Sequence, residues 1–174
     1  MPNRSRWNPV VFFVRGALGT SLMLSAAVAW ALGVGEAAPA FALPTATGDT
    51  VALDKLKGRV VYVDFWASWC GPCRRSFPWM NELQQKYGAA GFTVVGVNVD
   101  KRRPDAEKFL QQTPASFTIV YDPAGKTPEA YGVKGMPSSY LLDASGKVVA
   151  VESGFRDEQK AEFEARIKTL LPAR

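Results

Sequence analysis

The cysteines Cys70 and Cys73 stand in one C-x-x-C motif, and the chain has no other cysteine. A thiolate in such a pair can attack a disulfide in another molecule, and its neighbour can then close an intramolecular disulfide. The motif directly follows an apolar run, residues 60–66, and opens a segment of helical periodicity. A thiol at a helix N-terminus faces unpaired N–H groups and the positive end of the helix dipole, which stabilise the thiolate. We therefore predict a redox-active pair, with Cys70 exposed and Cys73 shielded one turn inward.

Two other uses of the motif stay open on the residues alone: a static structural disulfide, or half of a metal site shared between two chains. A loop this small constrains the unfolded chain little, which weakens the structural alternative. The chain has no histidine, which excludes Ser-His-Asp and Cys-His catalysis and every His-ligated metal. Two cysteines also exclude a four-Cys zinc or iron–sulfur site within one chain. We expect no metal and no organic cofactor, only the Cys70–Cys73 disulfide itself.

The N-terminal part of the chain has the order of an export signal. Arg4, Arg6 and Arg15 precede an uncharged, largely apolar stretch, residues 16–35. Small residues follow it, with candidate cleavage sites after Ala37 and after Ala40. About 20 apolar residues also suffice for a membrane helix. We predict that residues 1–37 are a signal peptide or an N-terminal membrane anchor, and that residues 38–174 form one exported domain.

The charge balance favours no polyanionic partner. The whole chain of 174 residues carries a net charge of +5, with 47% apolar residues, which suffices for a packed core. Without residues 1–37, 18 basic and 15 acidic side chains remain. This small excess, with no basic cluster of the kind that binds nucleic acid, predicts that nucleic acid is not a partner.

Apolar runs and helical periods alternate along the predicted domain. Residues 60–66 are β-branched and aromatic, which is typical of a central strand buried on both faces. Further strands are expected at 92–99 and 117–121, hairpins at 41–53 and 139–152, and helices at 73–87, 104–110, 127–131 and from 157 onward. This order predicts an α/β sheet that is covered on both faces and has an antiparallel pair at one edge.

Two segments carry a family resemblance. Residues 63–74, Val-Asp-Phe-Trp-Ala-Ser-Trp-Cys-Gly-Pro-Cys-Arg, resemble the thioredoxin active-site segment, and residues 133–140 resemble the segment around the family's cis-proline. The leader, the hairpin around Gly48, residues 56–59, Pro78 and the added strand and helix in the middle are similar to the exported TlpA/ResA/CcmG branch. The resemblance covers residues 38–171. It implies a thioredoxin-like fold: a central mixed sheet flanked by helices, with an N-terminal β-hairpin and a mid-domain strand–helix insertion.

The resemblance also implies roles for individual residues. Cys70 would be the attacking thiolate and Cys73 the resolving thiol. Pro137 would be cis and would lie against the disulfide, and the backbone of Met136 would pair with an extended substrate segment. The implied contact surface consists of Trp69, Gly71, Pro72 and Met136.

Asp64 interrupts the apolar run 60–66. Burial without a partner would raise the pKa of its carboxyl. In thioredoxins the matching acid helps to move the proton of the buried cysteine, whereas the TlpA branch often carries Glu three residues after the second cysteine, where this chain has Ser76. The alternative for Asp64 is a residue at a strand end that reaches water.

Together, these expectations predict that the protein is a periplasmic dithiol reductase of protein disulfides. The Gly71-Pro72 pair resembles reducing thioredoxins, whose potential is about −270 mV. A reductase in an oxidising compartment needs electrons from a membrane thiol-disulfide interchange protein. The resemblance suggests cytochrome c haem-attachment cysteines or copper-site cysteines as clients. The rival functions are a disulfide-forming oxidase and a Cu(I) carrier that uses Cys70, Cys73 and Met136.

Overall fold

The computed structural model describes residues 32–172. These residues contain a five-stranded sheet in the order β5-β4-β3-β6-β7 and a separate two-stranded sheet, β1-β2. The strands are β1 (Ala42–Pro44), β2 (Thr50–Ala52), β3 (Val60–Trp66), β4 (Phe92–Asn98), β5 (Thr118–Tyr121), β6 (Ser138–Leu142) and β7 (Val148–Ser153). The helices are α1 (Gly71–Tyr87), α2 (Arg103–Gln112), α3 (Lys126–Ala130) and α4 (Lys160–Leu170), with short 3-10 turns at Leu53–Leu56, Gly88–Ala90 and Asp157–Gln159.

Strand β3 is the centre of the large sheet, and every one of its residues is buried. It pairs in parallel with β4 and antiparallel with β6, so the sheet is mixed. Buried Val, Tyr, Phe and Trp side chains satisfy both faces of such a strand, which explains its almost continuous apolar sequence. The predicted central strand is confirmed.

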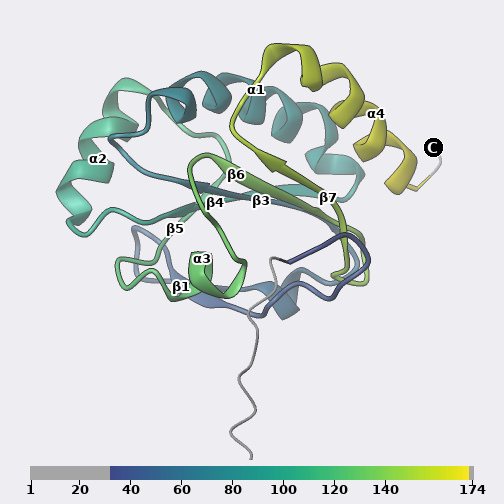
Figure 1. The fold of residues 1–174 in the computed structure, drawn as a ribbon, viewed down its shortest axis with the longest axis horizontal. Helices are drawn as coiled ribbons and strands as arrows, with labels where there is room; N and C mark the ends of the chain where they lie inside the picture. The colour runs from purple at the N-terminus through teal and green to yellow at the C-terminus, as the bar shows by residue number, and fades with distance from the viewer. Residues whose placement is uncertain (1–31, 173–174) are drawn as a thin grey trace, which may run out of the picture.

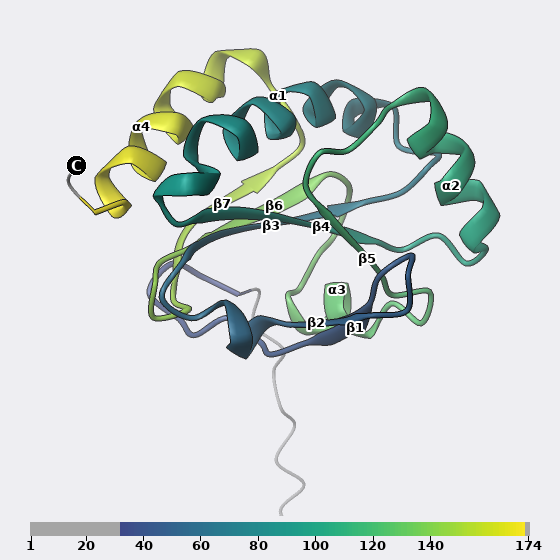
Figure 2. The ribbon, with the colours of Figure 1, turned by 180° about the vertical axis from the view of Figure 1, so that it is seen from behind.

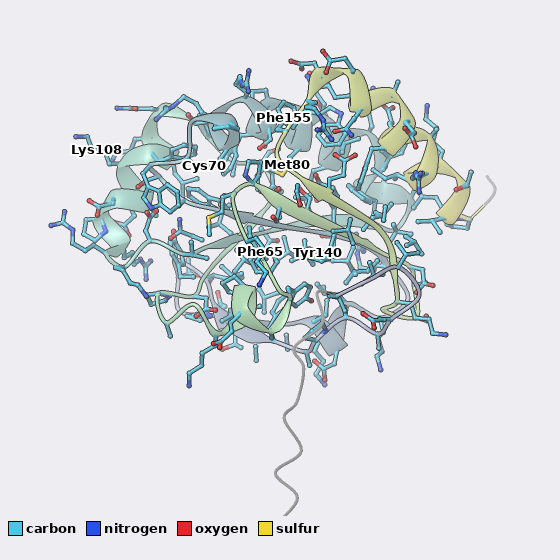
Figure 3. All side chains as sticks on the ribbon, in the orientation of Figure 1. Phe65, Cys70, Met80, Lys108, Tyr140 and Phe155 are labelled. Atoms are coloured by element: carbon cyan, nitrogen blue, oxygen red, sulfur yellow. A yellow bond between two sulfur atoms is a disulfide. The ribbon has the colours of Figure 1, made fainter. Side chains whose placement is uncertain are left out.

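Helices and the small sheet cover opposite faces of the large sheet. Figures 1 and 2 show α1, α2 and α4 on one face, with α3 and the β1-β2 sheet on the other. Two apolar clusters fill these layers because successive residues of a strand point to opposite faces. Tyr62 and Trp66 pack with α1, whereas Phe65 belongs to the cluster on the α3 side. In Figure 3, Cys70 and Met80 lie on the helix side of the sheet and Phe65 and Tyr140 on the other.

The expected hairpins and helices are present. The antiparallel pair β6-β7 closes over a turn in which Gly146 has a φ of 87°, a conformation that favours glycine. Helix α1 continues through Pro78, and α4 buries Phe163 and Ile167 as its periodicity predicts. Together with the mixed sheet, these elements form the thioredoxin-like fold with its N-terminal hairpin and mid-domain strand–helix insertion.

The predicted leader, residues 1–37, falls largely outside the described residues. Its last residues do belong to the described part: the Gly35 N–H donates to the Val148 carbonyl at 2.8 Å, and Ala37 forms a β-bridge with Lys147. From residue 32 to residue 172, no helix combines the length and the apolar character that crossing a membrane requires.

Candidate active site

A disulfide joins Cys70 and Cys73 at the start of α1, with their Cα atoms 5.3 Å apart. Cys70 is the N-cap residue of the helix, and its sulfur accepts a hydrogen bond from the Cys73 backbone N–H at 3.2 Å. Gly71 and Pro72 fill the first turn, where the N–H that proline lacks has no intrahelical acceptor in any case. The local geometry thus directs a backbone donor at Cys70 Sγ, which favours a thiolate there once the disulfide is reduced.

The predicted difference in exposure between the two cysteines is smaller than expected. Cys70 is 5% exposed and Cys73 is fully buried. The order is the one predicted, but the expectation that Cys70 is an exposed residue is wrong. Both cysteines belong to the apolar cluster under α1, because the helix start lies against the sheet rather than in solvent. Only a narrow part of Cys70 is therefore available to an incoming disulfide.

Exposed apolar surface lies next to the disulfide instead. The Trp69 side chain is 72% exposed, although large aromatic side chains are normally buried. Trp69 and Met136 line a groove of about 820 Å³ that runs along α3 and the loop before β6. The predicted contact residues Trp69 and Met136 thus share one groove, while Gly71 and Pro72 lie in the first turn of α1.

The Met136–Pro137 peptide bond is cis, as the resemblance implied. Pro137 directly precedes β6, and the first residue of β6, Ser138, pairs with Phe65 near the end of β3. The loop that carries Cys70 leaves β3 one residue later. The antiparallel pairing of β3 and β6 therefore brings two segments that are far apart in the sequence to the same end of the sheet.

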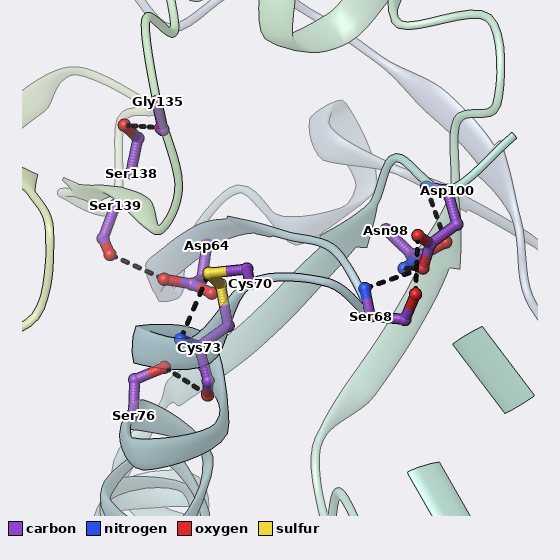
Figure 4. The surroundings of a disulfide bond; sticks show 10 residues. All are labelled: Asp64, Ser68, Cys70, Cys73, Ser76, Asn98, Asp100, Gly135, Ser138 and Ser139. Carbon is purple, nitrogen blue, oxygen red and sulfur yellow. Dashed lines mark hydrogen bonds between the residues drawn. A yellow bond between two sulfur atoms is a disulfide. The ribbon is translucent and has the colours of Figure 1, made fainter. Parts of the chain in front are cut away.

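Asp64 is fully buried in the middle of β3, so the alternative of a strand-end residue in water is wrong. Its Oδ1 accepts a hydrogen bond from the Ser139 hydroxyl at 2.7 Å, whereas Oδ2 has no partner among the described residues. Burial raises the pKa of Asp64 to about 7, and the Ser139 hydrogen bond opposes that rise. Figure 4 shows the Asp64 carboxylate between Ser139 and the disulfide.

Ser76 occupies the place where the TlpA branch often carries a glutamate. Its side chain is buried, and its hydroxyl donates to the Cys73 carbonyl at 3.0 Å. This contact stays within one helical turn and supplies no ionisable group. Asp64 is accordingly the carboxylate that the chain offers on the α1 face of β3.

A second polar network was not predicted from the sequence. The Asp100 carboxylate accepts hydrogen bonds from the Ser68 backbone N–H and from the Ser68 hydroxyl, each at 2.9 Å, and from the Asn98 amide at 2.8 Å. It connects the loop after β3 to the end of β4 (Figure 4). The available signal was the polar pair Asn98 and Asp100 at the end of a buried strand, since neighbouring parallel strands end at the same edge of a sheet. Ser139 was missed as well, because its register against Asp64 cannot be read from the sequence.

A cysteine pair lies at the N-terminus of the helix that follows the central strand, and a cis-proline precedes β6, the neighbour of that strand in the sheet. This combination defines a thioredoxin-like thiol-disulfide oxidoreductase. The comparisons with known proteins agree with this class. Residues 33–167 match the model of the Redoxin family, and the chain belongs to that family.

The relatives include thiol-disulfide oxidoreductases named ResA. The ResA of Geobacillus thermodenitrificans is 37% identical over 71% of this chain and 71% of its own length, and that of Bacillus subtilis is 33% identical over 71% and 69%. Among solved structures, a Chlorobium tepidum protein described as a thiol:disulfide interchange protein DsbE is 56% identical. The structural match has a TM-score of 0.77 and covers 80% of this chain and 98% of the Chlorobium tepidum chain.

Proposed function

We propose that this thiol-disulfide oxidoreductase is a periplasmic dithiol reductase of protein disulfides. The Cys70 thiolate attacks a client disulfide, forms a mixed disulfide and releases one client thiolate. Cys73 then gives its proton to Asp64 and attacks Cys70 Sγ. The second client thiolate leaves, and Cys70–Cys73 is oxidised as two electrons pass to the client. Pro137 lies against the disulfide in this proposal, and the Met136 backbone pairs with the client segment.

The observation that carries the proposal is the Cys70–Cys73 pair at the N-terminus of α1, with a backbone N–H directed at Cys70 Sγ. The reducing direction is supported by Gly71-Pro72, the same pair as in reducing thioredoxins. The exposed Trp69 and the groove it shares with Met136 support a polypeptide substrate, because an extended segment needs a surface rather than a closed pocket.

Export and an electron donor belong to the same proposal. Residues 1–37 act as a signal peptide or an anchor, and a membrane thiol-disulfide interchange protein re-reduces the pair. The contacts of Gly35 with Val148 and of Ala37 with Lys147 argue against a cut after Ala37, because that cut would remove them. Cysteines for haem attachment in cytochrome c or for a copper site are the proposed clients.

The reduction potential of the Cys70–Cys73 pair tests the direction. The purified domain is equilibrated with thiol buffers of graded potential, and the reduced fraction is measured by thiol alkylation. A value below about −220 mV supports the reductase. A value near −120 mV makes the protein a disulfide-forming oxidase. Titration of the reduced protein with Cu(I) examines the carrier alternative, which needs tight binding that is lost when Met136 is replaced by alanine.

A further inference from the structure

Asp64 is buried, and its hydrogen-bond partner Ser139 lies on the β6 side of its strand. On the β4 side it is in register with Gly96, and a Cβ atom there would lie 3.0 Å from Ile119, 3.1 Å from Phe117 and 3.2 Å from the Trp66 indole nitrogen. These side chains close that side. On the β6 side the register partner is Ser139, whose hydroxyl donates to the carboxylate.

A further polar residue lies next to Ser139 on the adjacent strand β7. Ser139 is in register with Glu152. Asp64, Ser139 and Glu152 all lie on the face of the sheet that α1 and α4 cover. Directly opposed residues of antiparallel strands have Cβ atoms about 4.5–5.5 Å apart. Asp64, Ser139 and Glu152 therefore form one row across three adjacent strands.

The row ends at solvent. Glu152 is half-buried and lines a pocket of about 260 Å³ between β7 and α4, together with Gln159, Glu162 and Arg166. Burial raises the pKa of Glu152, as it raises the pKa of Asp64, so the two carboxyls bind a proton with more similar affinity. Asp64 at the other end has no exposed surface of its own.

The Tyr62 phenol is buried next to this row of residues. Burial raises the pKa of the Tyr62 phenol, and the charges of Asp64 and Glu152 raise it further. The titratable residues that face this row are Tyr62 on β3, Glu152 on β7 and the cysteine pair on α1, whereas β4 presents Gly96, which has no side chain. Glu162, Arg166 and Arg156 face Glu152 from α4 and the segment before it.

We propose that Ser139 and Glu152 form a proton path that connects the buried Asp64 carboxylate with solvent at the pocket between β7 and α4. The path rests on the proposed role of Asp64 as the acceptor of the Cys73 proton. Once protonated, Asp64 passes its proton to the Ser139 oxygen while the Ser139 hydroxyl proton moves to Glu152. Glu152 then releases a proton to water, and the balance is one proton from Cys73 to solvent. A rotation of the flexible Glu152 side chain or one bridging water closes the gap to Ser139.

The test follows the resolving step alone. The reduced protein is mixed with excess oxidised glutathione in a stopped-flow instrument, and formation of the mixed disulfide is separated from Cys73 attack by acid quenching and mass spectrometry. Glu152→Gln is expected to slow Cys73 attack about tenfold or more at pH 7, and a small carboxylate base such as formate should restore the rate by accepting the proton in the surface pocket. Mixed-disulfide formation should not change.

Two further variants sharpen the result. Ser139→Ala should slow the same step, and formate should not restore the rate, because the path is then interrupted at a buried residue that formate does not reach. Ser139→Thr should keep the wild-type rate because threonine retains the hydroxyl. Glu162→Gln is the matched control: it removes a carboxylate of equal charge from the same pocket, outside the row, and should leave the rate unchanged.

The outcomes separate the path from the proposed function. An Asp64→Asn variant that slows Cys73 attack, alongside a Glu152→Gln variant at the wild-type rate, overturns the path and leaves Asp64 as the acceptor. An Asp64→Asn variant at the wild-type rate removes the acceptor role and the path with it. Equal slowing by Glu152→Gln and Glu162→Gln would point to pocket charge and would also overturn the path.

Discussion

The Ser68 backbone N–H and the Ser68 hydroxyl both donate to the Asp100 carboxylate, at 2.9 Å each. This pair of bonds joins the loop between β3 and the disulfide to the second residue after β4. Asp100 is 6% exposed, so its carboxylate relies on these donors and on Asn98 in place of water. The loop that presents Trp69 and Cys70 is therefore held from outside its own strand.

Replacement of Asp100 by alanine should destabilise the protein by about 3 kcal/mol, because hydrogen bonds to a charged group are lost and buried donors stay unpaired. Ser68→Ala removes only the hydroxyl bond and should cost about 1 kcal/mol. Urea denaturation of the oxidised proteins measures both. If Asp100→Ala unfolds at the wild-type urea concentration, the network does not hold the loop.

Replacement of Asp64 by asparagine should alter how stability depends on pH. The Asp64 carboxyl ionises near pH 3.8 in the unfolded chain but only near pH 7 in the folded protein. The wild-type protein therefore loses stability as the pH rises from 3.8 to 7, because the unfolded state releases this proton more easily. The advantage of Asp64→Asn in unfolding free energy should therefore grow by about 4 kcal/mol from pH 4 to pH 8 and stay level above that. Urea denaturation across this pH range measures it.

The matched control for this prediction is Asp54→Asn, which changes an exposed carboxylate in a 3-10 turn. Its stability relative to wild type should vary little between pH 4 and pH 8. A difference between Asp64→Asn and wild type that does not change with pH would contradict the raised pKa of Asp64.

Replacement of Cys73 by serine should trap the mixed disulfide. Cys70 can still attack, but no resolving thiol follows, so a covalent complex with a disulfide-bonded protein such as insulin should accumulate and turnover should stop. Cys70→Ser should give no complex. Non-reducing electrophoresis and intact mass measurement show the adduct. A complex that forms through Cys73 in Cys70→Ser would reverse the proposed order of attack.

Replacement of Trp69 by alanine should separate binding from folding. An exposed side chain contributes little to the core, so the unfolding free energy should change by about 0.5 kcal/mol or less. A tryptophan at the centre of a contact surface often contributes more than 1 kcal/mol to binding, and kcat/KM for insulin reduction should fall about tenfold. Val151→Ala, another exposed apolar residue, should keep the wild-type kcat/KM. An unchanged kcat/KM in Trp69→Ala would place the client elsewhere.

Much of the fold follows from local sequence. The continuous apolar run of β3 predicts a central strand because both faces of such a strand are buried. The periodicity from Cys73 to Tyr87 predicts α1, and the C-x-x-C motif between the two elements predicts a cysteine pair at a helix N-terminus. These signals are local, since they depend on side-chain spacing over one strand or a few helical turns.

The sequence by itself determined the chemistry of this protein: one cysteine pair, no histidine, and the strand and helix that present the pair. Only the tertiary structure decided how that chemistry is tuned. It decided that Cys70 and Asp64 are buried. It also set the Ser68–Asp100 and Asp64–Ser139 hydrogen bonds, which join residues 32 and 75 positions apart. Strand register sets the contact between Asp64 and Ser139, and a shift of one residue would turn Ser139 to the opposite face, so no local pattern specifies it.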